Sequence, residues 1–204
     1  MSIIVSLFNK KIITIAADSR MSILHSDGSL SFGNDDSQKL FMIKNNTLGI
    51  STCGNAEIMG GTVEEYTKEV LCNVIDLEAD MNVIAQSIAI RIPDGIICYV
   101  CGFFNGKPLV YRISDGNTRL INYPEENICG LMYDGMKKPL DEKYCNENIP
   151  DIESMSEEEM VEYAIDMIHY TCDKLENETN YSTCGGPIDV LVLNANSGKW
   201  IYKK

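Results

Sequence analysis

The stretch SIIVSLFNKKIITIAADSR, residues 2–20, decides the fold. It contains two runs rich in apolar and β-branched residues, Ile3–Phe8 and Lys11–Asp18, and only Asn9 and Lys10 separate them. Two such runs around a short polar turn predict a β-hairpin, so the chain opens with a pair of antiparallel strands.

The same pattern recurs along the chain. The strongest signal is Asn105-Gly106, because this dipeptide favours the tight type I′ turn and lies between two β-rich runs. A further run after Asp115-Gly116 extends that hairpin into a meander. The predicted strands after the first hairpin are Ser29–Phe32, Lys39–Ile43, Thr47–Thr52, Ile96–Phe104, Lys107–Ser114, Thr118–Tyr123, Ile188–Leu193 and Lys199–Tyr202.

Helical periodicity occurs in three places. Thr62 with Glu65, and Ser156 with Glu159, are capping boxes that predict the first turns of two helices. A third helix is predicted over Asn82–Arg91, because Pro93 ends it. The apolar stripes after the capping boxes are Val63, Tyr66, Val70, Leu71, Val74 and Ile75 in one helix and Met160, Val161, Ala164, Met167, Ile168 and Leu175 in the other.

The order of these elements predicts the fold class. Strands joined by hairpins form antiparallel sheets, and helices that come in blocks exclude Rossmann and TIM-barrel designs. We expect an α+β fold in one domain, residues 1–204, with two sheets covered on both outer faces by helices. Leu131–Met155 shows no clear period, so we expect an acidic surface loop that conceals a short helix or forms an insertion.

Composition excludes several classes of function. Asp+Glu 30 against Lys+Arg 17 gives a net charge of −13, which disfavours nucleic-acid binding. No apolar stretch approaches the ~20 residues that span a membrane, and the first charges follow an apolar run, so we expect a cytoplasmic protein without a signal peptide.

We expect the 8 cysteines to be reduced. Cys98 and Cys101 would face opposite sides of a strand, which argues against a shared metal ion.

Four residues can carry chemistry, although each also has an ordinary structural explanation. Ser2 follows Met1, and once the methionine is removed its own α-amine can take the hydroxyl proton, as in N-terminal nucleophiles. Asp18 ends a predicted strand, Lys39 opens another, and Gly54 lies where a strand passes into a helix. Taken singly, these residues are typical of a common chain start, a turn or a strand edge.

In order, the segments that hold these residues resemble a known family. Residues 2–6 (SIIVS), 15–20 (IAADSR), 37–41 (SQKLF), 53–57 (CGNAE) and 184–190 (CGGPIDV) resemble segments of proteasome β-type subunits and their bacterial relatives, which are N-terminal-nucleophile (Ntn) hydrolases. The spacing from Ser2 to Asp18 matches without a gap, and the resemblance covers nearly the whole chain.

The resemblance implies a four-layer αββα sandwich and hydrolysis of peptide (amide) bonds, with no metal or cofactor. Ser2 Oγ would be the nucleophile and its own amine the proton shuttle. Lys39 would lower the pKa of both groups through its charge, and Asp18 would hold Lys39 in place. The backbone N–H of Gly54 would bind the oxyanion.

The resemblance also implies how substrates are bound. Ser22 would hold the substrate backbone as an added strand, and Met21 and Thr52 would lie near the pocket for the residue before the cut. Substrates would be peptides or unfolded proteins. The chains would form a homo-oligomeric ring that leaves room for an ATPase partner.

The chain departs from the family pattern in its supporting residues. The family has Gly-Ser-Gly before its third helix, whereas residues 128–131 read ICGL, so either Cys129 replaces the serine or the loop differs. Where the family has an aspartate and a serine before Gly-Gly, this chain has Tyr181 and Cys184. Two substitutes for these groups are open, Asp173 on the one hand and Ser182 with Thr183 on the other.

Three alternatives to a peptidase remain open. One is a catalytically silent ring subunit, in which a retained Met1 would leave Ser2 without an α-amine. Another is an Ntn amidase acting on small amides, although its usual nucleophile is a cysteine and none lies near this N-terminus. A thiol or metal protein is the last, and the strand geometry of Cys98 and Cys101 weakens it.

Overall fold

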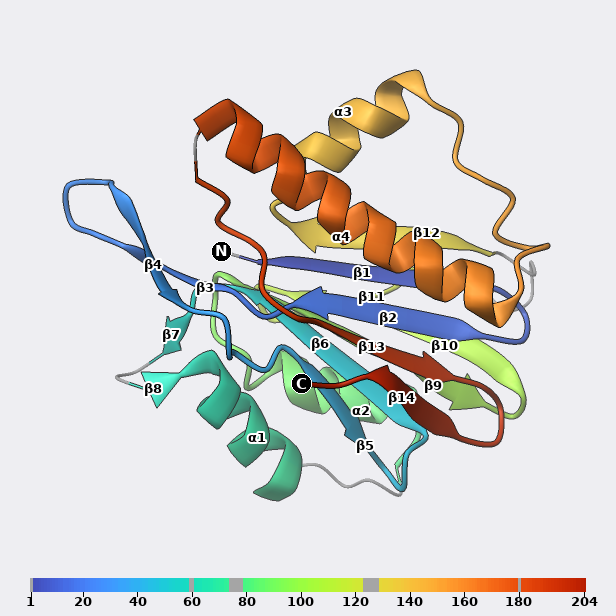
Figure 1. Cartoon of the computed structure of the whole chain (residues 1–204). Coiled ribbons are helices and arrows are strands. Elements are labelled where there is room, and N and C mark those ends of the chain that lie inside the picture. The colour runs from blue at the N-terminus through green and yellow to red at the C-terminus, as the bar shows by residue number, and fades with distance from the viewer. Residues whose placement is uncertain (1, 59–60, 74–78, 123–128, 180) are drawn as a thin grey trace.

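Two five-stranded antiparallel sheets form the centre of the computed structural model, which describes residues 2–58, 61–73, 79–122, 129–179 and 181–204 (Figure 1). The first sheet has the order β12 (Gly130–Gly135), β1 (Ile3–Phe8), β2 (Ile13–Asp18), β13 (Ile188–Leu193) and β14 (Gly198–Tyr202). The second has the order β11 (Asn117–Leu120), β10 (Lys107–Ser114), β9 (Ile96–Phe104), β6 (Leu48–Gly54) and β5 (Leu40–Ile43). Two short hairpins accompany them, β3 (Met21–Leu24) with β4 (Leu30–Asn34) and β7 (Glu57–Ile58) with β8 (Gly61–Thr62).

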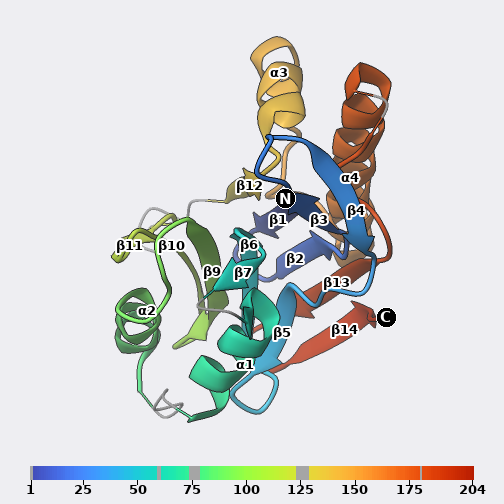
Figure 2. The same cartoon turned by 90° about the vertical axis from the view of Figure 1, so that its left-hand side faces the viewer.

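Helices lie on both sides of this pair of sheets (Figures 1 and 2). Helix α4 (Glu157–Thr179) packs on β1, β2 and β13, and α3 (Lys138–Asn146) packs on α4. On the other side, α2 (Met81–Ala89) packs on β9, β10 and β11, and α1 (Val63–Asn73) contacts β7 and β8. The chain is therefore a mixed α+β structure in which each large sheet packs against a helix.

Strand β1 shows why the first stretch of sequence is apolar at nearly every position. Ile3, Val5 and Leu7 pack into the core beneath α4, whereas Ile4 and Phe8 pack into a core made by residues of both sheets. Because successive side chains of a strand point to opposite faces, a strand buried on both faces needs a continuous apolar run rather than an alternating one.

Several predicted details are confirmed. Asn105 and Gly106 both have positive φ angles, 50° and 73°, as the type I′ turn between β9 and β10 requires. The Thr62–Glu65 capping box is formed, with the Glu65 backbone N–H 3.1 Å from Thr62 Oγ1. The second box is formed as well, with the Ser156 N–H 2.7 Å from the Glu159 carboxylate. Val74, Ile75 and Tyr123 lie outside the described residues.

The segment Leu131–Met155 is not a surface loop, although the short helix that we expect it to conceal is present. Its first part is β12, which pairs with β1 along its full length, and its second part contains α3. Leu140 and Ile152 are buried in the core beneath α4. Hydrophobic periodicity does not reveal this strand, because it is short and contains a buried aspartate, Asp134, near its end. The charge of Asp134 is balanced by Arg112 from the other sheet.

Strand β3 is a second omission. It pairs with β4, which is predicted over Ser29–Phe32 and observed over Leu30–Asn34. Four residues that end beside a polar turn carry too little alternation to be recognised.

Across the described residues, no helix combines the length and apolar character needed to cross a membrane.

Candidate active site

Ser2 lies immediately before β1, an inner strand of the first sheet. The backbone N–H of Met136 donates to the Ser2 carbonyl at 2.8 Å, and Ile3 is paired with Gly135 of β12. Ser2 is 7 % exposed, so its side chain is almost enclosed. The unpredicted strand β12 is thus the element that positions this end of β1.

Asp18, at the end of β2, is the best-connected carboxylate of the site. Its Oδ1 accepts from the Ile3 backbone N–H at 3.0 Å and from Lys39 Nζ at 2.7 Å. Its Oδ2 accepts from the backbone N–H groups of Gly185 at 2.9 Å and Arg20 at 3.3 Å. Because β1 and β2 are antiparallel, the end of β2 lies beside the start of β1. The Asp18 carboxylate therefore links Ile3, the residue after Ser2, to Lys39.

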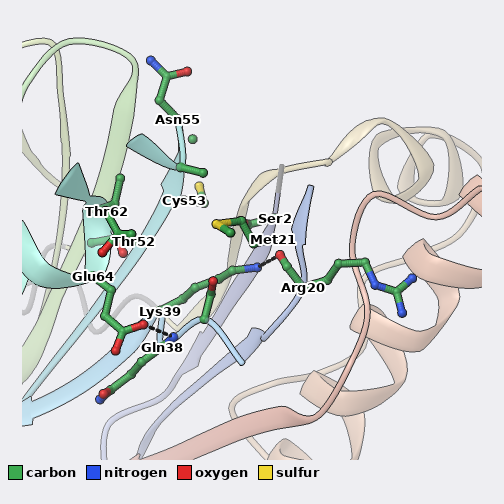
Figure 3. Close-up of a pocket in the computed structure, with 14 residues that line it drawn as sticks. Ser2, Arg20, Met21, Gln38, Lys39, Thr52, Cys53, Asn55, Thr62 and Glu64 are labelled. Carbon is green, nitrogen blue, oxygen red and sulfur yellow. Dashed lines mark hydrogen bonds between the residues drawn. The ribbon is translucent and has the colours of Figure 1, made fainter. Parts of the chain in front are cut away.

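Lys39 reaches this carboxylate from the position immediately before β5. Its Nζ also donates to the carbonyl oxygen of Arg20 at 2.6 Å, and its side chain extends toward Ser2 (Figure 3). The side chains of Lys39 and Asp18 are 8 % and 0 % exposed, which makes this a buried ion pair. Buried charges need such partners, because an isolated charge away from water costs several kcal/mol.

A pocket opens beside these residues. Five of the seven residues singled out from the sequence line it: Ser2, Met21, Lys39, Thr52 and Gly54. The structure thus brings together four segments that are distant in the sequence. The other lining residues are Arg20, Ser37, Gln38, Cys53, Asn55, Ala56, Thr62, Val63 and Glu64.

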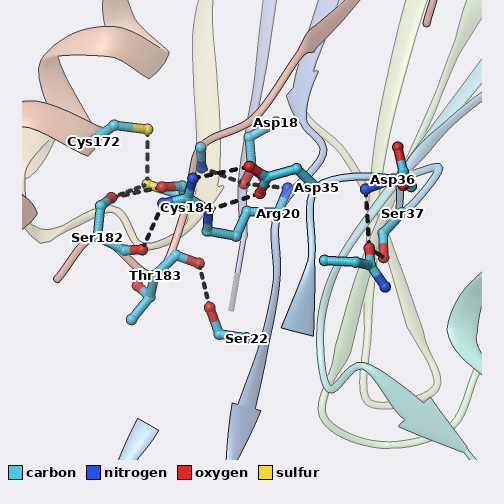
Figure 4. Close-up of polar contacts among 12 residues, drawn as sticks. Asp18, Arg20, Ser22, Asp35, Asp36, Ser37, Cys172, Ser182, Thr183 and Cys184 are labelled. Carbon is cyan, nitrogen blue, oxygen red and sulfur yellow. Dashed lines mark hydrogen bonds and ion pairs between the residues drawn. The ribbon is translucent and has the colours of Figure 1, made fainter. Parts of the chain in front are cut away.

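The remaining two predicted residues lie behind the pocket wall. Asp18 holds Lys39 from the sheet side without lining the pocket. Ser22, in β3, donates its hydroxyl hydrogen to the Thr183 carbonyl at 3.0 Å and is not among the lining residues (Figure 4). Its side chain therefore connects β3 to the segment before β13.

Gly54 is required by the backbone at the end of β6. Its φ angle is +118°, and a Cβ atom there would lie 2.2 Å from the carbonyl oxygen of Gly95. Only glycine tolerates this conformation and this close approach. The residue lies in the walls of two pockets, both of which Ser2 also lines.

A second, larger pocket lies on the other side of Ser2 and Gly54. An ion pair from both sheets lines it: Arg112 Nε and Nη2 donate to Asp134 at 2.6 and 3.1 Å. The Tyr99 hydroxyl donates to the same carboxylate at 2.8 Å. The sequence carries no local signal for this cluster, because its members come from three different strands.

Cys53 lines both pockets, but its thiol is poorly suited to nucleophilic attack. Burial raises the pKa of Cys53 well above its ordinary value, and the negative charge of Asp134 adds to the effect. A thiol that stays protonated at neutral pH is a weak nucleophile. In the same way, burial raises the pKa of Cys101 to about 12.

Metal binding finds no support at the cysteines. Cys98 packs into the core beneath α2, whereas Cys101 packs into the core between the sheets, so their side chains face opposite sides of β9 as expected. Within the part of the chain that the structure describes, no group of three or more His, Cys, Asp or Glu side chains is placed to hold a metal ion.

The proposed substitution by Cys129 is wrong. Gly130 pairs with Phe8 at the far end of β1, whereas Gly135 pairs with Ile3 next to Ser2. Cys129 therefore precedes the end of β12 that lies away from Ser2. The residues that stand beside Ser2, before α3, are Asp134, Gly135 and Met136.

The segment before β13 contains Ser182, one of the proposed substitutes, and its Gly185 N–H donates to Asp18. Ser182 donates its hydroxyl hydrogen to the Cys184 carbonyl at 2.6 Å, and its own carbonyl accepts from Arg20 Nη1 at 3.2 Å. Arg20 also forms a bidentate ion pair with Asp35, and this hydrogen bonding lowers the pKa of Asp35. Asp173 is exposed on α4 and lines neither pocket.

Replacement of Gly135 by alanine should test how tightly Ser2 is held. The φ angle of Gly135 is +98°, and a Cβ atom would lie 2.0 Å from the Ser2 carbonyl oxygen. We expect Gly135→Ala to lower the free energy of unfolding by about 3 kcal/mol or more in urea denaturation, because backbone strain and overlap add. Gly106→Ala is the matched control, since Gly106 has φ +73° with nothing within 4 Å and should lose only about 1 kcal/mol. Equal losses in the two variants would contradict the tight packing at Ser2.

Comparisons with known proteins bear on the fold. No protein-family model matches the sequence, and no curated protein matches it. A solved structure of an Anbu mutant from Hyphomicrobium sp. strain MC1 is similar, with a TM-score of 0.65 and 17 % identity, over 100 % of this chain and 86 % of that chain. Anbu is a bacterial proteasome-like protein. At this identity the likeness concerns the fold alone, and it shows that the chain has a proteasome-like fold.

Proposed function

We propose that this chain is an N-terminal-nucleophile hydrolase of the four-layer αββα type that cleaves peptide bonds, with Ser2 as the nucleophile once Met1 is removed. The observation that carries the proposal is the buried ion pair between Lys39 Nζ and Asp18 Oδ1, 2.7 Å long, beside a pocket that Ser2, Lys39 and Gly54 line.

The chemistry would need only groups of this chain. The freed α-amine of Ser2 accepts the hydroxyl proton while Oγ attacks the carbonyl carbon, and it then protonates the departing amine. The ammonium of Lys39 disfavours a second positive charge nearby, so it lowers the pKa of the α-amine toward neutrality. The Gly54 N–H stabilises the oxyanion, a contribution that is typically about 3 kcal/mol for one donor. Water then hydrolyses the acyl-enzyme.

The two pockets favour a peptide over a small amide. Ser2 and Gly54 line both pockets, so space exists on either side of the proposed scissile bond. Met21 and Thr52 line the smaller pocket, which we assign to the residue before the cut. A small amide would leave the larger pocket empty.

The proposal is tested by the state of the N-terminus and by peptide cleavage together. N-terminal mass spectrometry identifies chains with and without Met1, and fluorogenic peptides measure hydrolysis by each. We expect cleavage only after Met1 is removed. Processed protein without activity on any peptide would favour the catalytically silent ring subunit instead.

We further propose that the chains assemble into a closed homo-oligomer. Val83, in α2, and Ile90, its C-cap residue, are 45 % and 81 % exposed, and such apolar side chains favour a protein contact. We expect light scattering at micromolar concentration to show an oligomer and the Val83→Asp/Ile90→Asp variant to be a folded monomer. The control is Asn82→Asp, an exposed neighbour that should leave assembly unchanged. A monomeric parent chain would contradict the proposal. If the oligomer is a ring, it would provide the surface for an ATPase partner.

A further inference from the structure

Two cysteines beside the Asp18 cluster lie in sulfur–sulfur contact. Sγ of Cys172, in α4, is 3.1 Å from Sγ of Cys184, in the segment before β13 (Figure 4). Both are free thiols in this structure. A disulfide bond is about 2.05 Å long, so the two sulfurs need to approach each other by about 1 Å to form one.

We propose that Cys172 and Cys184 are an oxidation site, at which a low-molecular-weight disulfide converts the two thiols into an intramolecular disulfide bond. The exposure of the two residues gives each a distinct role. Cys172 is partly exposed, so the reagent reaches it first, whereas Cys184 is fully buried and can react only with Cys172. The Ser182 hydroxyl lies 3.7 Å from Cys184 Sγ and is hydrogen-bonded to the Cys184 carbonyl, which holds the buried sulfur in place.

The reaction consists of two thiol–disulfide exchanges. The hydrogen bond with Cys184 and burial raise the pKa of Cys172, but Cys172 is the one thiol of the pair that the reagent can reach. Its thiolate attacks one sulfur of the reagent, which forms a mixed disulfide and releases the first reagent thiol. The thiolate of Cys184 then attacks the Cys172 sulfur, which forms the protein disulfide and releases the second reagent thiol. Two protein thiols are oxidised by two electrons, the reagent disulfide is reduced to two thiols, and the two protons are transferred to these thiols.

The bond would link α4 to the segment that supports Asp18. Gly185, next to Cys184, donates its N–H to Asp18 Oδ2 at 2.9 Å, and its carbonyl accepts from the N–H groups of Ser19 and Arg20 at 3.0 and 2.9 Å. A covalent link at Cys184 therefore restrains a segment with three hydrogen bonds to the end of β2. Because a cross-link restricts the unfolded chain, we expect oxidation to raise the melting temperature by ~5 °C. This inference does not depend on hydrolase activity.

The test is incubation of the full chain with oxidised glutathione, followed by alkylation in denaturant and peptide mass spectrometry. We expect a peptide that links Cys172 to Cys184, and a rise in melting temperature that dithiothreitol reverses. Cys145→Ser should behave in the same way, because Cys145 is exposed on α3 and outside the pair. Cys172→Ser should give neither the linked peptide nor the rise.

Two results would overturn the proposal. One is glutathione that remains attached to Cys172 while Cys184 is still alkylated, because the buried sulfur would then fail to resolve the mixed disulfide. The other is the same rise in melting temperature in Cys172→Ser, because the stabilisation would then come from another cysteine. The mass measurement is made on the unmutated chain, so a variant that folds poorly does not affect it.

Discussion

We expect replacement of Ser2 by alanine, in a chain that has lost Met1, to lower the proposed peptide hydrolysis by at least about 10⁴-fold and to leave the fold intact. Without Oγ no acyl-enzyme forms, and the hydroxyl of Thr52, which lines only the smaller pocket, has no α-amine beside it as a base. Removal of one oxygen at the edge of β1 costs little packing. Initial rates on fluorogenic peptides measure the loss, and thermal melting of the same samples measures the fold.

Ser6→Ala is the matched control for this variant. Ser6 lies on β1 as well, is fully buried, and has its Oγ 3.9 Å from Cys101 Sγ, away from both pockets. We expect it to keep full hydrolysis. Activity that persists in Ser2→Ala, or an active preparation that retains Met1, would disprove the assignment of the nucleophile.

A chemical probe gives the same prediction an independent readout. A peptide epoxyketone reacts with both a hydroxyl and a free α-amine on one residue, so it should form a stable adduct at Ser2 of the processed chain. The adduct should be absent from Ser2→Ala and from chains that retain Met1. An adduct on Cys53 instead would indicate a thiol enzyme, against the raised pKa of that buried thiol.

The elements of the fold that could be predicted from the sequence are those whose signal is local. The β9–β10 hairpin was predictable because Asn105-Gly106 selects one turn type, and α1 and α4 because capping boxes precede apolar stripes. Strand β12 was not predictable, because Asp134 breaks its apolar run and is compensated by Arg112, 22 positions earlier in the chain. A charge balanced by a distant partner looks, in the sequence alone, like a surface residue.

The candidate site also contains residues that the sequence predicts and contacts that it does not. Ser2, Asp18, Lys39 and Gly54 were identified because each lies in a motif of a family that the chain resembles. The backbone donor from Gly185 to Asp18 joins residues 167 positions apart, and only the sheet order brings them together. The roles of these four residues stay predictions, which the variants at Ser2 and Lys39 test.

Replacement of Lys39 by methionine should be the most damaging change to the core of the site. It keeps most of the apolar length of the side chain but leaves the fully buried Asp18 carboxylate without a cation. Breaking a buried ion pair on one side typically costs about 3–5 kcal/mol, and we expect that loss in the free energy of unfolding. Hydrolysis should be lost as well, because the charge proposed to tune Ser2 and its amine is gone.

Lys68→Met serves as the matched control, because Lys68 is half exposed and pairs with Glu64 along α1. The loss in free energy of unfolding for Lys68→Met should stay within about 0.5 kcal/mol, the usual contribution of an exposed helical pair.

A double-mutant cycle of Lys39→Met with Asp18→Asn separates the ion pair from the remaining contacts of Asp18. Because the double variant no longer buries an uncompensated charge, its destabilisation should be about 2 kcal/mol smaller than the sum of the single losses. Additive losses would mean that Lys39 and Asp18 stabilise the fold independently, and the proposed role of Asp18 in holding Lys39 would then be wrong.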